Sequence, residues 1–317
     1  MTKKQRLTHK KVSHARRADL RNGLLFSSPV IIGLLLFTVY PVGASLYYSF
    51  CNYTGLKPPT WVGMANYHRL LTDPLVTKSL ANTAVFAAFS VPLGVAVAFW
   101  LALLLNQKVR GMALFRTLFY LPSIVPTVAT SVLWLWVLNP QYGILPGILR
   151  GIGVYSLFHM FGIPEPGWMA DPMWAKPALI LMSLWGAGGS MIIFLAGLQD
   201  VPQDLFDAAE VDGATTLHRT IHITLPFMSP YIFFSIVMGL IGAAQYFTQA
   251  YVMTGGQGGP VNSTLFYAMY LFQNAFHFFK MGYACAMAWF LFLVILAATI
   301  IVFKSSARFV YYQGDAK

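Results

Sequence analysis

The chain has 317 residues, of which 57% are hydrophobic and 10% are charged, whereas a soluble domain carries roughly 25% charged residues. So much apolar surface exceeds what one soluble core buries, and it predicts an integral membrane protein. The 21 Lys and Arg outnumber the ten Asp and Glu, but they lie in short blocks between apolar segments. There they indicate membrane topology and not nucleic-acid binding. The cysteines, Cys51 and Cys285, lie far apart, which argues against a zinc cluster or a disulfide framework.

Six apolar segments are long enough to cross a bilayer as helices. They are predicted at Leu24–Phe50, Leu80–Leu105, Met112–Leu138, Trp174–Gly197, Ser229–Tyr251 and Tyr283–Phe303. The first is too long for a signal-peptide apolar region and lacks a small-residue cleavage pattern, so we expect it to remain in the chain. The sequence therefore predicts an all-α membrane protein with a basic tail, residues 1–23, and a six-helix domain, residues 24–317.

The distribution of basic residues predicts the orientation of these helices. An even number of spans places both termini on one side, together with the second and fourth loops. Fifteen Lys and Arg fall on that side and six on the other. Because cytoplasmic loops carry the excess of basic residues, both termini are predicted to be cytoplasmic.

Two further segments lie between the predicted spans. Gly143–Phe161 is moderately apolar but interrupted by Pro and Gly, so it is expected outside the membrane or as a re-entrant segment. Leu265–Phe279 is aromatic but too short to cross, which favours an interfacial helix. Prolines within the spans are expected to kink their helices; they are Pro29, Pro41, Pro92, Pro122 and Pro126.

The predicted spans contain no ionisable residue away from their ends, where Arg116 and Lys176 can extend toward water. Proton-coupled transporters usually need such residues, so a secondary transporter is disfavoured. The chain has no nucleotide-binding, zinc-protease or serine-hydrolase motif, and we do not expect it to be an enzyme. His218 and His222 are spaced to share a helix face but lack a third ligand, so no metal site is predicted. The glycine-rich segment Thr254–Pro260 is typical of a turn.

The predicted cytoplasmic segment 198–228 contains half of all the acidic residues. They are Asp200, Asp204, Asp207, Glu210 and Asp212. The pattern predicts a short helix from about Pro202 to Val211, a turn at Gly213 and a second short helix ending by Pro226. Small side chains make the first helix slender, and one of its faces gathers Leu205, Ala208, Ala209 and Asp212. Such a helix is expected to dock on a partner protein.

This segment, Asp207-Ala-Ala-Glu210-Val-Asp212-Gly213-Ala214, resembles the EAA loop of permease subunits in binding-protein-dependent ATP-binding-cassette importers. The similarity is to the sugar branch, which includes the maltose and glycerol-phosphate systems. Supporting stretches extend over most of the chain after residue 24. They are Tyr40-Pro41, Ser49-Phe50, Phe115-Arg116-Thr-Leu-Phe-Tyr-Leu-Pro122, Asn139-Pro-Gln-Tyr-Gly143, Trp168-Met-Ala-Asp171-Pro172, Thr254-Gly-Gly and Asn262-Ser-Thr.

The sequence departs from the family pattern at two positions. Asp207 stands where the family usually has Glu, which shortens the carboxylate side chain by one methylene. Pro146 stands where an Asn often follows Tyr-Gly-Ile-Leu. The first departure concerns the ATPase-facing helix, and the second concerns only the outer loop.

The resemblance implies an inner-membrane assembly of a bacterium or archaeon. Its other members would be a second, similar permease, two cytoplasmic ATPases that bind ATP and magnesium, and an extracytoplasmic solute-binding protein. No cofactor would be bound by this chain, and its substrate would be a sugar, with glycerol phosphate or another polyol derivative as the alternative. The residues expected to couple the chain to the ATPases are Asp207, Ala208, Ala209, Glu210, Asp212, Gly213, Ile223, Leu225 and Pro226.

Small and polar residues at helical spacing on the fourth and fifth spans suggest a substrate pathway. The fourth carries Met182, Trp185, Gly186 and Gly189, and the fifth carries Gly239, Gly242, Ala243, Tyr246 and Gln249. An aromatic ring could lie against a sugar, although small residues at this spacing also suit tight helix packing in membranes. The maltose-type resemblance implies sugar contacts at Gly239, Ala243 and Tyr246. Lesser candidates are Gln245, Asn262 and Asn274.

Overall fold

The computed structural model of the chain describes residues 14–107, 109–306 and 310. Its first apolar segment forms one long helix from α1 (His14–Leu34) and α2 (Tyr40–Ser49), joined by the π-helical turn η1 (Leu35–Val39). Residues Asp19–Ser49 are long and apolar enough to cross a membrane, which confirms the predicted first span. The predicted basic tail lies in part outside the described residues, since the description begins at His14.

Three other helices are continuous over a membrane-spanning length. They are α4 (Pro74–Leu105), the helix Thr216–Ala244 and α16 (Met281–Ser306). The second of these consists of α12 (Thr216–Arg219), the π-helical turn η3 (Thr220–Thr224) and α13 (Leu225–Ala244). The predicted short helix ending at Pro226 is therefore wrong, because α12 continues through Pro226 into α13. The predicted end of the fifth span at Tyr251 is also wrong, because α13 stops at Ala244.

Two of the predicted spans are broken. The third consists of α5 (Met112–Ile124) and α6 (Thr127–Val137), bent by 99°, and the fourth of α9 (Ala175–Trp185) and α10 (Gly188–Gln199), bent by 46°. Pro126 lacks an amide donor and disfavours helical geometry at the residue before it, which accounts for the first break. Counting each bent pair as one span gives six within the described residues, as the sequence predicts.

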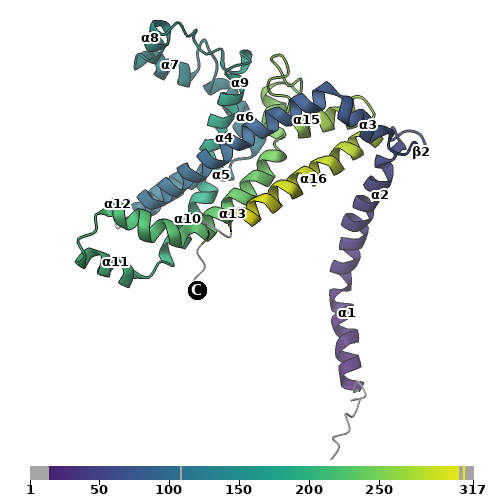
Figure 1. Cartoon of the computed structure of the whole chain (residues 1–317), viewed down its shortest axis with the longest axis horizontal. Coiled ribbons are helices and arrows are strands. Elements are labelled where there is room, and N and C mark those ends of the chain that lie inside the picture. The colour runs from purple at the N-terminus through teal and green to yellow at the C-terminus, as the bar shows by residue number, and fades with distance from the viewer. Residues whose placement is uncertain (1–13, 108, 307–309, 311–317) are drawn as a thin grey trace, which may run out of the picture.

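The helices form a bundle from which the first helix extends away (Figure 1). Helix α4 packs against α10, α13 and α9, while α2 packs along α16. Trp289 of α16 donates its indole N–H to the Ser45 hydroxyl of α2 over 3.2 Å. The start of α1, the end of α16 and the segment around residues 200–215 lie toward the same end of the molecule in Figure 1. This common placement agrees with an even number of crossings.

Short elements connect the long helices at the opposite end. They are the two-stranded sheet of β1 (Cys51–Asn52) and β2 (Thr60–Trp61), then α3 (Ala65–Thr72), α7 (Ile144–Gly151), α8 (Val154–Met160), the 3-10 helix η2 (Trp168–Ala170), α14 (Thr248–Met253), α15 (Tyr267–Phe272) and the π-helical turn η4 (Gln273–His277). The strands pair antiparallel. Helices α7 and α8 fill the predicted segment 143–161 and lie beyond the end of the bundle opposite α11 (Gln203–Val211) in Figure 1. The glycine-rich segment after α14 is a turn, as predicted, with positive φ at Gly255, Gly256 and Gly258.

The first part of the segment predicted as an interfacial helix is instead buried, whereas Phe276, Phe278 and Phe279 near its end are exposed. Helix α15 packs against α4 and α16, and Phe266, Tyr267 and Met269 are fully buried. The Tyr267 hydroxyl donates to the Met287 carbonyl oxygen over 3.0 Å, and its amide donates to the Thr83 hydroxyl over the same distance. An aromatic helix can therefore pack inside the bundle where neighbouring helices satisfy its polar atoms.

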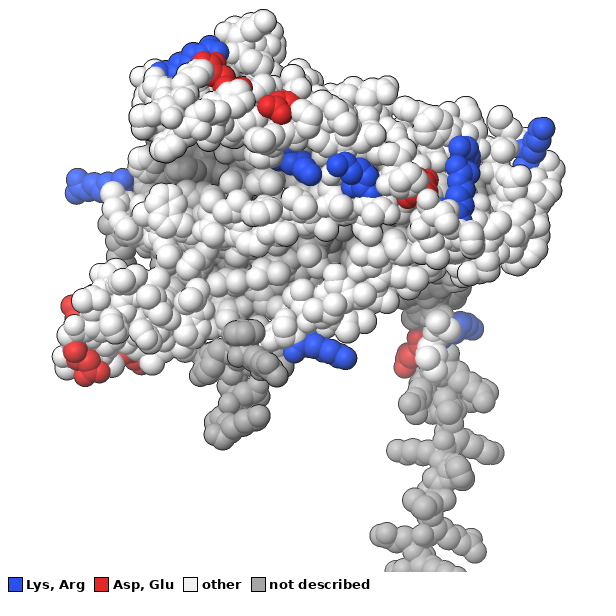
Figure 2. All heavy atoms as spheres, turned by 45° about the horizontal axis from the view of Figure 1, so that its top comes forward, with Lys and Arg blue, Asp and Glu red and all other residues white. Residues whose placement is uncertain are grey.

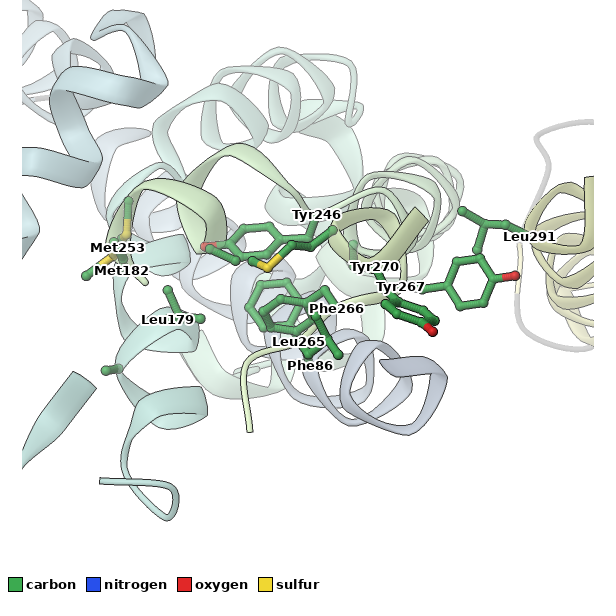
Figure 3. Packing of buried hydrophobic residues seen from close by; sticks show 14 of the residues in the cluster. Phe86, Leu179, Met182, Tyr246, Met253, Leu265, Phe266, Tyr267, Tyr270 and Leu291 are labelled. Carbon is green, nitrogen blue, oxygen red and sulfur yellow. The ribbon is translucent and has the colours of Figure 1, made fainter. Parts of the chain in front are cut away.

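The core has an aromatic centre in which Phe86 of α4 lies beside Tyr246 and Phe266 (Figure 3). A second cluster joins the other half of α4 to α10 around Met191, Phe194 and Met228. By contrast, no residue in the most apolar stretch of the first helix is buried. In water such a surface would aggregate, so the helix belongs in lipid or against another membrane protein.

Candidate functional site

The acidic segment forms a helix that stands clear of the bundle. Helix α11 (Gln203–Val211) begins after Pro202 and lies below α12 in Figure 1, joined to the bundle through its two ends. Asp207, Ala208 and Glu210 are exposed, and Ala209 is half-buried. Exposed apolar side chains on the same helix include Leu205 and Val211, the latter 89% exposed. This mixture of acidic, small and apolar exposed side chains suits contact with another protein.

Gly213 ends α11 in the geometry that the sequence predicts. Its φ is +73°, the left-handed conformation that glycine adopts without strain. The Gly213 amide donates to the Glu210 carbonyl oxygen over 3.1 Å, and the Ala214 amide donates to the Ala209 carbonyl oxygen over 2.9 Å. These two bonds make a Schellman motif, which satisfies carbonyl groups that the helix end would leave unpaired. A side chain at Gly213 would meet no neighbour, so the backbone conformation alone requires glycine.

Both ends of this segment are fixed to α13 or to its extension. On the α10 side, the Tyr231 hydroxyl of α13 donates to the Asp200 carboxylate. The Tyr231 ring lies over Gly197 of α10, where an added Cβ would approach the ring to 2.8 Å. On the other side, Arg219 of α12 forms an ion pair with Glu210 over 3.2 Å. These contacts join the segment around α11 to α13 on one side and to α12 on the other.

The remaining predicted coupling residues lie on this continuous helix. Ile223 is in the π-helical turn η3, while Leu225 and Pro226 are the first residues of α13. Asp207 accepts a hydrogen bond from the Gln203 side-chain amide over 3.1 Å, and Asp212 is the exposed C-cap residue of α11. The structure thus places the nine predicted residues on α11, its C-terminal turn and the beginning of the Thr216–Ala244 helix.

A polar cavity of about 200 Å³ lies where α5, α6, α9 and α14 approach one another. Among its lining residues are five that the sequence predicts: Met182, Trp185, Gly186, Tyr246 and Gln249. The lining also has four hydroxyl side chains that the sequence analysis missed: Ser123, Thr127, Thr130 and Ser183. Ser123, Thr127 and Thr130 were missed because the 99° break brings the end of α5 and the start of α6 together at the cavity, which a continuous helical pattern does not predict. Ser183 lies on α9, beside the predicted Met182.

A second cavity, also of about 200 Å³, lies between α4, α9, α10 and α13. It is lined by the predicted residues Gly239, Gly242, Ala243 and Tyr246, and also by Ser90, Ser183, Ser190 and Ser235. Tyr246 and Ser183 line both cavities. The Cβ of a larger residue at Gly239 would lie 3.1 Å from Val91 Cγ1, so this glycine also permits close helix packing.

Tyr246 has a packed ring and a buried hydroxyl group without a hydrogen-bond partner among the described residues. The ring packs against Phe86 and Phe266, with centroid distances of 4.2 and 5.3 Å (Figure 3). The side chain is 8% exposed and its hydroxyl has no hydrogen-bond partner among the described residues. The interpretation of Tyr246 as a flat surface for a sugar ring is therefore unsupported, whereas hydrogen bonding by its hydroxyl is available.

The predicted single helix faces are wrong, because both helices end within them. Helix α9 ends at Trp185, so Gly189 belongs to α10; it lies against Ser123 of α5 and lines neither cavity. Helix α13 ends at Ala244, which places Gln249 on α14. Of the lesser candidates, Asn274 is buried and donates to the Tyr270 carbonyl oxygen over 2.9 Å. That bond gives Asn274 a structural role.

Basic side chains are spaced across the end of the bundle opposite α11, with a few acidic ones among them (Figure 2). The Asp73 carboxylate accepts hydrogen bonds from the Tyr270 and Tyr283 hydroxyls over 2.7 and 2.9 Å. Burial raises the pKa of Asp73, but these hydrogen bonds, the Leu75 amide and the charge of Arg69 together outweigh it and hold the pKa below its usual value. Hydrogen bonding from Arg150 likewise lowers the pKa of Glu165.

His218 and His222 stack with a centroid distance of 4.9 Å, and the described residues contain no group of three potential metal ligands.

Long apolar helices, two broken pairs and polar cavities between them define an all-α integral membrane transport protein. The chain belongs to the family described as binding-protein-dependent transport system inner membrane components, whose model matches residues 90–311. It is a multi-pass inner membrane protein and a permease of the ATP-binding-cassette transporter class, which confirms the resemblance seen in the sequence.

Named relatives and a solved structure support this assignment. The chain is 41% identical to the probable ABC transporter permease protein YesP of Bacillus subtilis, covering 96% of each chain. It is 34% identical to the lactose transport system permease protein LacF of Rhizobium radiobacter, covering 90% of this chain and 94% of that one. A crystal structure of a bacterial ABC transporter that imports the acidic polysaccharide alginate contains a chain with the same fold. That match has a TM-score of 0.77 and 22% identity, covering 94% of this chain and 100% of that one.

Proposed function

We propose that this permease carries a saccharide into the cell, driven by an ATPase that docks on segment 198–228. The observation that carries the proposal is the exposed helix α11, which is fixed at both ends to α10 and α13. Helix α13 in turn supplies Gly239 and Ala243 to the second cavity. A partner that pulls on α11 therefore moves a wall of the cavity, as expected for a helix bundle that alternates between two arrangements.

The lining of the cavities supports a saccharide substrate. Hydroxyl side chains, the Gln249 amide and the Trp185 ring line the first cavity, and such groups bind sugar hydroxyls through hydrogen bonds and apolar contact. Neither cavity is lined by Lys or Arg, so a phosphate with two negative charges would lack a side-chain cation. A saccharide is therefore favoured over glycerol phosphate. The relative LacF is named for lactose transport.

The proposed assembly contains a second permease, two ATPases that bind ATP and magnesium, and an extracytoplasmic solute-binding protein. The first helix supports the second permease, because its exposed apolar surface suits contact with another membrane protein. In this arrangement α11 and both termini face the cytoplasm. Helices α7 and α8 and the loops at their end face the binding protein.

The test is uptake by the assembled complex in proteoliposomes. Candidate saccharides are supplied with the complex's own binding protein, and uptake is measured with ATP or with a non-hydrolysable analogue inside. ATP-dependent uptake is expected, and Gly239→Leu should abolish it because the larger side chain meets Val91 and fills the second cavity. Trp185→Ala should lower uptake while ATP hydrolysis continues. Equal uptake with ATP and with the non-hydrolysable analogue would contradict the proposal.

A further inference from the structure

The break between α5 and α6 leaves a helix N-terminus at the first cavity. Helix α6 has eleven residues and begins at Thr127, with Pro126 as an N-cap that provides no side-chain hydrogen bond. The first described backbone bond of this helix runs from the Thr130 amide to the Pro126 carbonyl oxygen over 3.0 Å. The amides of residues 127–129 precede it and have no acceptor among the described hydrogen bonds. Thr127 and Thr130 line the cavity, so the partial positive charge of the helix end lies beside it.

A second, independent feature of the same cavity is the unpaired hydroxyl of Tyr246. This side chain is 8% exposed, lines the cavity and has no hydrogen-bond partner in the described part of the chain. Phe86 and Phe266 hold its ring, so the hydroxyl cannot easily turn toward water. A buried hydroxyl without a partner costs about 1–3 kcal/mol. A ligand that accepts its hydrogen bond would remove this cost.

The charges around the cavity also favour an anion. No Asp or Glu lines it. Lys176 lies seven residues before Ser183 on α9, which places both on one face of that helix, with Lys176 nearer the outer end. Its ammonium group donates to the Asn82 side-chain oxygen over 3.1 Å, and Lys78 lies nearby. Neither lysine has a carboxylate within 4.0 Å among the described residues, and Figure 2 shows basic side chains spaced across this end of the molecule.

We propose that the first cavity binds the carboxylate of an acidic saccharide, so that the transported sugar carries a uronic acid. This inference rests on the proposed function and names its substrate class. The amides at the start of α6 and the Tyr246 hydroxyl donate to the carboxylate, while Ser123, Thr130 and Gln249 bind sugar hydroxyls. Lys176 and Lys78 raise the local concentration of anions at the outer end. A singly charged carboxylate matches a helix end and one hydroxyl without a side-chain cation.

The first experiment compares each acidic probe with its neutral ester. The probes are disaccharides of galacturonic, glucuronic and mannuronic acid and their methyl esters, with lactose and glycerol 3-phosphate as further competitors. Binding to the complex's own binding protein is measured first, and then uptake by the complete complex in proteoliposomes. At least one uronic acid disaccharide should bind and be taken up about tenfold better than its ester. Preference for an ester, lactose or glycerol 3-phosphate would overturn the inference.

The second experiment places a competing charge in the cavity. Thr127→Asp puts a carboxylate at the start of α6, and Thr127→Asn provides a neutral side chain of the same shape. The ratio of acidic to ester uptake should fall about tenfold in the Asp variant relative to the Asn variant. Tyr246→Phe removes only the hydroxyl and should also lower this ratio. Thr60→Asp, on the exposed strand β2, controls for added negative charge on the outer face and should leave the ratio unchanged.

The outcomes separate the two proposals. An equal ratio in Thr127→Asp and Thr127→Asn would overturn the inference, and ATP-dependent uptake of a neutral saccharide would still support the proposed function. If no saccharide, acidic or neutral, enters in an ATP-dependent manner, both proposals fail.

Discussion

Asp73 links three elements at the end of the bundle opposite α11. Its carboxylate accepts an amide hydrogen bond from Leu75 over 2.9 Å, which caps the start of α4. The same carboxylate accepts the hydroxyl hydrogen bonds from Tyr270 and Tyr283, and the Arg69 guanidinium lies 4.5 Å from the centre of the Tyr283 ring. One side chain thus anchors α4, α15 and α16 together.

Replacing Asp73 should lower the stability of the folded chain. Asp73→Ala removes the N-cap, worth about 0.5–2 kcal/mol, and leaves two tyrosine hydroxyls without their acceptor. Asp73→Asn keeps an N-cap oxygen and should lose less. Thermal unfolding in detergent measures both, and equal midpoints for Asp73→Ala and the parent would contradict this role.

Low pH should weaken the hydrogen bonds that the Asp73 carboxylate accepts. The pKa of Asp73 is lowered in the folded chain, so its contribution is fully present above the ordinary Asp pKa of about 3.9. It is lost as the pH falls through the lower folded pKa. Between about pH 5 and 3 the unfolding midpoint should therefore fall less in Asp73→Asn than in the parent. Parallel pH profiles would contradict the assignment.

At the scale of single residues, local backbone signals could be predicted and distant contacts could not. The positive φ of Gly213 follows from a glycine at a helix end, because that conformation depends on neighbours in the sequence. The roles of Ser123, Thr130 and Ser183 depend on where broken helices meet in space. Their sequence pattern is that of ordinary small residues in a membrane helix.

Two π-helical turns precede prolines at corresponding positions. The turn η1 ends at Val39, two residues before Pro41, and η3 ends at Thr224, two residues before Pro226. Proline has no amide hydrogen to donate, and its ring meets the carbonyl group four residues earlier. The wider turn accommodates this carbonyl while the helix continues. Proline therefore adds a local turn here and does not end the helix.

Pro226→Ala should uncouple the cavity from α11. An alanine can donate the missing amide hydrogen bond, which allows η3 to become regular α-helix. Removing the extra residue of the turn would rotate α12 by about 100° relative to α13. The number of sugars transported per ATP hydrolysed should fall in proteoliposomes.

Pro41→Ala provides the matched control for this prediction. It makes the same local change in the first helix, which lines neither cavity. Its ratio of transport to hydrolysis should equal that of the parent. An unchanged ratio in Pro226→Ala would show that the η3 turn does not transmit movement.

At the scale of elements, hydropathy predicts where the chain crosses the membrane but not how each crossing is built. Six apolar segments suffice to locate the four continuous helices and the two bent pairs. The break at Pro126 was expected only as a kink, because a proline can be accommodated with or without loss of the helix. The burial of α15 was missed because an aromatic segment of that length is equally suited to a membrane interface.

In the whole molecule, segments that are predicted to lie on the same side of the membrane lie at the same end of the structure. The start of α1, segment 200–215 and the end of α16 lie at one end, and α7, α8 and β2 lie at the other (Figure 1). Eight of the basic residues counted for orientation lie outside the described residues: Lys3, Lys4, Arg6, Lys10, Lys11, Lys108, Arg308 and Lys317. The arrangement thus fixes which segments share a side, and the basic residues predict which side is cytoplasmic.

Single cysteines test this orientation. In a chain with Cys51→Ala and Cys285→Ala, cysteines are placed at Thr60 and Ser156 on one side and at Gln107 and Thr216 on the other. All four positions are exposed. A membrane-impermeant thiol reagent applied to intact cells should label only Thr60→Cys and Ser156→Cys, while lysed cells should show all four labelled. Labelling of Thr216→Cys in intact cells would show that the predicted orientation is reversed.

The most direct test of the central claim uses Gly213→Pro in the complete complex. Proline cannot adopt the φ of +73° at this position, so the variant should reorient α11 while the membrane helices remain intact. Gly43→Ala, where an added Cβ meets no neighbour within 4 Å, is the control. The measurement is ATPase co-purification together with ATP hydrolysis stimulated by the loaded binding protein in proteoliposomes. Gly213→Pro should insert normally but lose ATPase binding or stimulation, and parental values of both would contradict the claim that this segment couples the permease to its ATPase.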